Sequence, residues 1–202
     1  MARPIRLKTH WFKLEQARSP TDLASAMAAV VWRTASQRVG SLRDARFEVS
    51  VGAPYVAMQA EILALLVTMT DRLAYAQDSG NFRTEFTSAL TIRIADLMAD
   101  NYDDLLVDPG QESLRKRFID LVNQRFADYA DYPFDGNEVG FPMLRLFGQF
   151  LEEACADDDD RRWIRDQAMT VEGPAAVETI IKAMRGVLGQ EAAPKRSVAA
   201  GE

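Results

Sequence analysis

The segment PYVAMQAEILALLVTMTDRLAYAQD, residues 54–78, has a centre from Ile62 to Val67 in which every residue is apolar. A helix built on this centre leaves no side for water over nearly two turns. We therefore expect residues 54–78 to form the central helix of a bundle, with the other helices packed around it.

Four polar residues of this segment fall on one side of a 3.6-residue period: Glu61, Thr68, Asp71 and Arg72. A buried charge without a partner costs several kcal/mol, so we expect Asp71 and Arg72 to pair with charged groups of other helices, for example Arg93. The bundle closes over the polar stripe in this interpretation.

An alternative places the same end of the central helix at the bottom of an apolar pocket. Asp71, Arg72 and Tyr75 then become the candidate ligand-binding residues. Polar groups at the end of an apolar pocket are typical of sites that bind amphipathic small molecules.

The rest of the chain also has helical periodicity, and we predict an all-α, single-domain bundle of six or seven helices over residues 19–189. The first helix begins at the cap Ser19-Pro20 and ends at Gly40, and an extended connector follows. The further helices are expected at about 82–106, 111–130, 141–155, after the aspartates 157–160, and from Gly173-Pro174 to 189. Residues 1–18 form a basic arm, and residues 190–202 a disordered tail.

Basic residues of the segment 111–130 lie mostly off its apolar stripe, which indicates a solvent-exposed face. They are Arg115, Lys116, Arg117 and Arg125.

The segment 141–155 is apolar on more than one side, so we expect two buried faces. Gly148 in its middle costs about 1 kcal/mol of helix stability relative to alanine, which indicates close contact with a neighbouring helix. Met143, Leu146 and Phe150 form the second face and are candidates for an interaction surface.

Charge is unevenly distributed along the chain. The net charge is −6, yet residues 1–20 hold five basic residues against the single acid Glu15. A basic arm fits an acidic body, either its own or that of a second copy, and Trp11 and Phe12 are its candidate contact residues. The acidic composition argues against nucleic-acid binding.

The chain lacks the residues that the common catalytic sites need. His10 is the only histidine, Cys155 is the only cysteine, and no glycine-rich phosphate loop is present. A catalytic triad or a zinc site needs more of these side chains, so we expect no metal and no cofactor, and the sequence leans against enzymatic activity without deciding the question.

One carboxylate cluster supports an enzymatic alternative. The cluster comprises Asp100-Asn101-Tyr102-Asp103-Asp104, with Asp96 one turn earlier. Read in reverse order, it is similar to the aspartate-rich motif of helical isoprenoid synthases. The resemblance implies a magnesium-dependent enzyme acting on a diphosphate.

The sequence therefore favours a non-enzymatic helical protein that acts through protein contact, as an adaptor, assembly factor or chaperone-like module, and as a homodimer. A bundle that binds an amphipathic small molecule is the alternative. A single cysteine cannot form an internal disulfide, and no run of about 18 uninterrupted apolar residues occurs, so we expect a soluble cytoplasmic protein without a membrane span.

Overall fold

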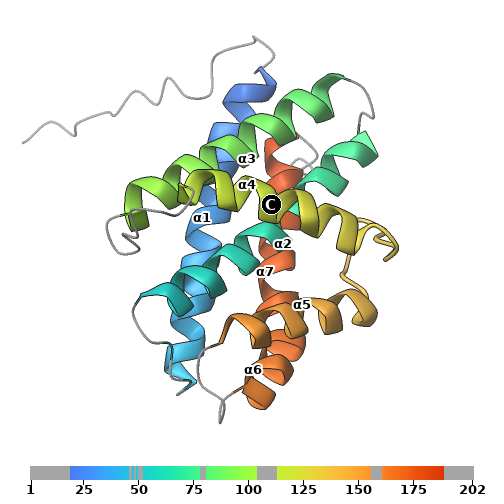
Figure 1. The fold of residues 1–202 in the computed structure, drawn as a ribbon. Coiled ribbons are helices and arrows are strands. Elements are labelled where there is room, and N and C mark those ends of the chain that lie inside the picture. The colour runs from blue at the N-terminus through green and yellow to red at the C-terminus, as the bar shows by residue number, and fades with distance from the viewer. Residues whose placement is uncertain are drawn as a thin grey trace, which may run out of the picture.

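The computed structural model describes residues 19–45, 47, 49, 52–77, 81–103, 113–155 and 161–188. The described residues form seven α-helices and one π-helical segment (Figure 1). They are α1 (Pro20–Asp44), α2 (Ala53–Gln77), α3 (Asn81–Tyr102), α4 (Leu114–Tyr129), α5 (Phe141–Ala154), α6 (Arg161–Gln167), the π segment (Ala168–Glu172) and α7 (Gly173–Val187). The predicted all-α bundle is confirmed, whereas the basic arm and the tail lie outside the described residues.

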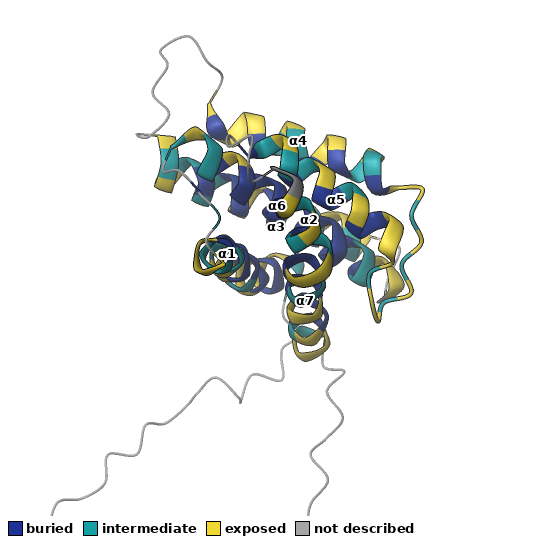
Figure 2. Cartoon of the chain, turned by 90° about the horizontal axis from the view of Figure 1, so that it is seen from below, coloured by how far each residue is buried: buried dark blue, intermediate teal, exposed yellow. Residues whose placement is uncertain are grey.

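Helix α2 lies at the centre of this bundle, as its sequence predicts. Every residue from Met58 to Asp71 is buried, and α1, α3, α4, α5 and α7 all pack against it. Figure 2 shows the result for the outer helices, whose buried residues face inward and whose exposed residues face outward. The apolar core is one connected cluster with α2 at its middle.

The predicted start of α1 is confirmed by its capping interactions. The Asp22 backbone N–H donates to the Ser19 hydroxyl over 3.1 Å, and the Ser19 backbone N–H donates to the Asp22 carboxylate over 3.4 Å. This reciprocal pair satisfies two amides that a helix start leaves without partners.

The predicted end of α1 at Gly40 is wrong, because the helix continues to Asp44. Val39 and Leu42 are fully buried and continue the inner face of α1 past the glycine. Burial of these side chains outweighs the cost of about 1 kcal/mol that a glycine adds inside a helix. The extended connector is correspondingly shorter, and its described residues form no strand.

The predicted helix start at Gly173-Pro174 agrees with the start of α7, but the chain does not leave helical geometry before it. Residues 161–187 form a continuous helical run in which Glu172 and Gly173 keep helical dihedral angles. The Gly173 backbone N–H donates to the carbonyl oxygen of Ala168, five residues earlier. Proline cannot donate and its ring crowds the preceding turn, and the wider π turn accommodates Pro174 without ending the helix.

The predicted close contact at Gly148 is confirmed. A Cβ atom placed on Gly148 would lie 2.9 Å from the carbonyl oxygen of Arg165 and 2.9 Å from Cγ of Met169. Helices α5 and α6 therefore approach each other more closely at this point than any larger residue would allow.

Candidate functional site

The central feature of the candidate site is an ion pair between α2 and α4. Arg125 donates from Nε to Oε2 of Glu61 over 2.8 Å and from Nη2 to Oε1 over 2.7 Å. Glu61 is 8% exposed and Arg125 is 7% exposed. The prediction that Arg125 belongs to a solvent-exposed face is therefore wrong, because its partner lies on the buried stripe of α2.

Arg125 is held on its other sides as well. Its Nη1 donates to Asp128 over 2.7 Å, and its guanidinium carbon lies 3.5 Å from the centre of the Phe150 ring. Burial lowers the pKa of Arg125, but the hydrogen bonds and charges of Glu61 and Asp128 outweigh burial and leave that pKa above its ordinary value. Arg125 is a fixed cation that orients the Glu61 carboxylate.

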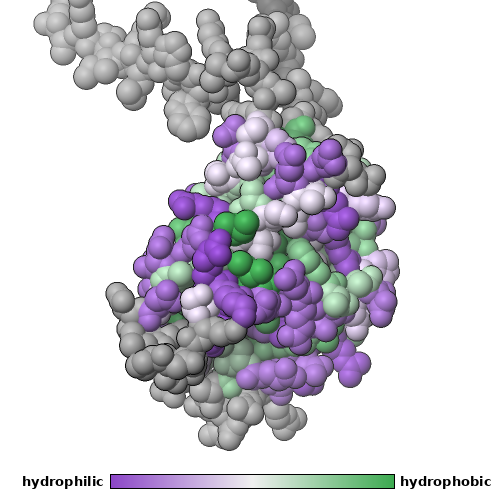
Figure 3. Space-filling view, turned by 45° about the horizontal axis from the view of Figure 1, so that its top comes forward, coloured by the Kyte–Doolittle hydropathy of each residue, from purple (hydrophilic) through white to green (hydrophobic). Residues whose placement is uncertain are grey.

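A cavity of about 510 Å³ opens beside this ion pair. It lies between the first half of α2, Met98 of α3 and the first half of α4. Eight of its ten described lining residues are apolar: Ala53, Val56, Ala57, Ala60, Met98, Leu114, Phe118 and Leu121. Glu61 and Arg117 are the charged lining residues. Figure 3 views the molecule from the side of α3 and α4, where apolar side chains form a limited area among hydrophilic ones.

The other end of the polar stripe is closed by hydrogen bonds. Asp71 accepts from Nε and Nη2 of Arg83 over 2.9 and 2.7 Å, and from the Thr87 hydroxyl over 2.7 Å. Helix α3 does supply the partner, but it is Arg83, whereas Arg93 is exposed. Three of the about four acceptor sites of the Asp71 carboxylate are thus occupied by groups of its own chain.

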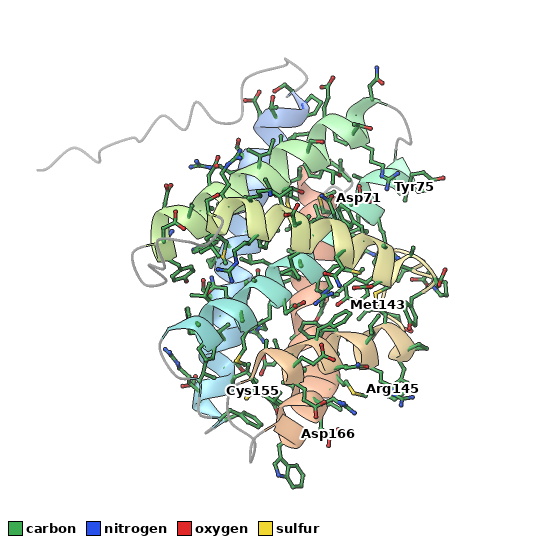
Figure 4. The ribbon with its side chains drawn as sticks, viewed as in Figure 1. Asp71, Tyr75, Met143, Arg145, Cys155 and Asp166 are labelled. Atoms are coloured by element: carbon green, nitrogen blue, oxygen red, sulfur yellow. The ribbon has the colours of Figure 1, made fainter. Side chains whose placement is uncertain are left out.

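The other two predicted ligand-binding residues lie nearby but point in different directions. Arg72 donates to the backbone carbonyl oxygens of Tyr129 and Tyr132, and burial lowers its pKa more than Asp71 raises it. Tyr75 is 56% exposed and points outward at the end of α2 (Figure 4). Its ring lies 4.9 Å from the guanidinium carbon of Arg83. None of the predicted triad lines the cavity beside Glu61.

The predicted interaction surface on α5 is mostly covered by the chain itself. Met143 is 1% exposed, so its assignment to a surface is wrong. Leu146 and Phe150 are half-buried, and the Phe150 ring lies edge-on to Tyr129 with their centres 6.0 Å apart. The second apolar face of α5 therefore packs against the end of α4. Trp11 and Phe12 lie outside the described residues.

The aspartates at the end of α3 do not converge. Asp96 accepts from Nε of Arg115 over 2.7 Å at the surface, and Asp100 and Asp103 are exposed. Asp104 lies outside the described residues. In the part of the chain that the structure describes, no group of three or more His, Cys, Asp or Glu residues is placed to hold a metal ion.

Sequence reasoning missed the buried carboxylate of Glu172 in the π segment. Glu172 is fully buried and accepts from the Ser41 hydroxyl over 2.8 Å, from Gln167 over 3.0 Å and from Arg38 over 3.4 Å. The glycine and proline that follow it suggested a helix start with Glu172 outside, so the pattern contained no signal of burial.

Comparison of the chain with protein-family models, with curated proteins and with solved structures finds no match. One described helix, Ala53–Ala76, is long and apolar enough to cross a membrane by length and composition alone. Inside the protein 78% of its most apolar window is buried, and the core helix of a soluble protein passes the same test.

Proposed function

We propose that this protein binds a small apolar molecule in the cavity between α2, α3 and α4. The observation that supports the proposal most strongly is a volume of about 510 Å³ with a mainly apolar lining and two charged residues. Pockets for small ligands typically measure about 300 to 1,000 Å³ and combine apolar walls with a few polar groups.

The lining also favours binding over catalysis. The described lining residues include no histidine, cysteine, serine, threonine or lysine. Glu61 is the carboxylate among the described lining residues, and it already accepts two hydrogen bonds from Arg125. A general base or nucleophile needs a reactive group that is available to the substrate, and Arg125 already holds both oxygens of this carboxylate.

A fluorescence titration with N-phenyl-1-naphthylamine tests the proposal on the full chain. This neutral dye brightens when it leaves water for an apolar site. We expect saturable brightening with the native protein. The variant Ala57→Trp places an indole at the exposed edge of the cavity, and dye affinity should fall by about tenfold or more because the indole occupies the ligand's volume.

The matched control is Ala29→Trp, which changes another exposed alanine, on α1, that does not line the cavity. Its dye affinity should equal that of the native chain. Equal affinities for all three proteins, or no saturable signal from the native chain, would rule out binding in this cavity.

The hypothesis that the protein acts through protein contact, as a homodimer, stays a prediction. The two apolar faces of α5 support it less than expected, because Phe150 contacts Tyr129 and Arg125 of the same chain. Large exposed apolar residues among the described ones, such as Phe141 and Trp163, lie on different helices. Single exposed apolar residues are common on monomeric proteins, so they favour no second function.

A further inference from the structure

We propose that the cavity selects apolar molecules that carry a hydrogen-bond donor, either a hydroxyl or a protonated amine, and that Glu61 is the acceptor for this group. The inference depends on the proposed function, since it names the class of ligand for the same cavity. It goes further by assigning the polar end of the ligand to one side chain.

Glu61 is both a cavity-lining residue and a carboxylate with acceptor capacity left. An ionised carboxylate has about four lone-pair sites. Arg125 occupies two of them, one on each oxygen, through bonds of 2.7 and 2.8 Å. The remaining sites are the principal hydrogen-bond acceptors that the described side chains of the cavity offer a ligand.

The Glu61 carboxylate is also held in place before any ligand arrives. Arg125 grips both oxygens, and Arg125 is itself fixed by Asp128 and by the ring of Phe150. A preorganised acceptor loses little conformational entropy when a donor binds, which favours selective recognition.

A ligand without a donor is penalised at this position. It removes water from Glu61 but leaves the freed acceptor sites unmatched, and sites built for a hydrogen bond discriminate strongly against such analogues. An anionic ligand is penalised by the like charge of Glu61. Arg117 lines the same cavity, but it is exposed, so water and salt screen its charge.

Four naphthalenes of similar size, used to displace N-phenyl-1-naphthylamine from the full chain, test the inference. 2-Naphthol and 2-naphthylmethylamine carry a donor, 2-methoxynaphthalene accepts but cannot donate, and 2-naphthoate is an anion. We expect the better of the two donors to bind about tenfold more tightly than 2-methoxynaphthalene, with 2-naphthoate the weakest. The ratio of the two donor affinities distinguishes a hydroxyl ligand from an amine.

A double variant assigns the selectivity to Glu61. In Glu61→Leu with Arg125→Met both charges are replaced by apolar groups, an exchange that buried ion pairs often tolerate, and a thermal melt checks the fold. The preference for the better donor over 2-methoxynaphthalene should disappear. The matched control, Asp71→Leu with Arg83→Met, removes the other ion pair of α2 away from the cavity and should keep the preference.

The outcomes separate the two proposals. If the dye binds the native chain but the methoxy compound displaces it as well as the better of the two donors does, or 2-naphthoate binds best, the role of Glu61 is refuted and the cavity proposal stands. If the dye does not bind at all, both proposals fail.

Discussion

Arg125 and its neighbours on α4 show how differently adjacent basic residues behave. Arg115, Lys116 and Arg117 are exposed, whereas Arg125 is buried against Glu61. The Coulomb attraction and two charge-assisted hydrogen bonds offset the cost of removing both charges from water. Whether a basic residue is buried therefore depends on the side chain that faces it and not on its own type.

Tyr129 provides a prediction at the residue scale. Its ring is buried against Phe150, and its hydroxyl has no hydrogen-bond partner among the described residues. Burial, and then the charge of Glu61, raises the pKa of Tyr129, so the hydroxyl stays protonated. An unmatched buried hydroxyl costs stability, so Tyr129→Phe should raise the free energy of unfolding by about 1 kcal/mol, measured by urea denaturation.

The control is Tyr102→Phe, which also keeps the ring. The Tyr102 hydroxyl donates to the buried amide oxygen of Gln59 over 2.9 Å. Its removal leaves that oxygen unmatched and should lower the free energy of unfolding by about 1 kcal/mol. If Tyr129→Phe destabilises the protein instead, an ordered water or another group binds the Tyr129 hydroxyl in the native protein.

At the scale of elements, two helical glycines of opposite character determine how α1 and α5 are built. Gly40 lies inside α1, and a Cβ atom added there would meet nothing within 4 Å. At Gly148 the same atom would meet the backbone of α6. Glycine at position 148 permits contact between helices, whereas glycine at position 40 only weakens the helix.

The two glycines therefore predict opposite effects of the same substitution. Gly148→Ala gains helix propensity but overpacks the contact with Arg165, so the free energy of unfolding should fall by about 1 kcal/mol or more. Gly40→Ala gains helix propensity without any overpacking, so it should raise the free energy of unfolding by about 0.5 to 1 kcal/mol. Thermal or urea denaturation measures both. Stabilisation by both alanines would show that α5 and α6 are not in close contact.

At the scale of the whole molecule, the position of α2 predicts its protection from hydrogen exchange. Residues 62–70 are buried, and five helices pack against α2. Their amides can reach water only when the bundle separates, so they should exchange at the rate of global unfolding, as measured by NMR or mass spectrometry. The loop from Asp135 to Gly140, whose residues are exposed or half-buried, should exchange much faster. Exchange of α2 before α1 and α3 would contradict a central α2.

Much of the fold could be predicted from local pattern. The central helix was expected at 54–78 and is observed at Ala53–Gln77, and the cap at Ser19 and the contact at Gly148 were also predicted correctly. The sequence signal for each of these lies within a few helical turns of the chain. The end at Gly40 was predicted wrongly, because glycine is only a weak break when tertiary packing continues the helix. The start of α7 at Gly173 was predicted correctly, but the π segment that leads into it without a break was not predicted.

The site was less predictable. Glu61 was recognised as part of the buried stripe, but the candidate ligand residues were placed at its other end, around Asp71 and Tyr75. Nothing local distinguishes the two ends, since each has a carboxylate beside apolar residues.

The helical fold around residues 54–78 follows from local pattern alone, because apolar spacing along one segment specifies which of its sides must leave water. The closure of the stripe by Arg83 at one end and the cavity beside its other end emerge only when the helices pack. The physical reason is distance along the chain: Glu61 and Arg125 are 64 residues apart. A cavity likewise exists only in the space left between packed helices.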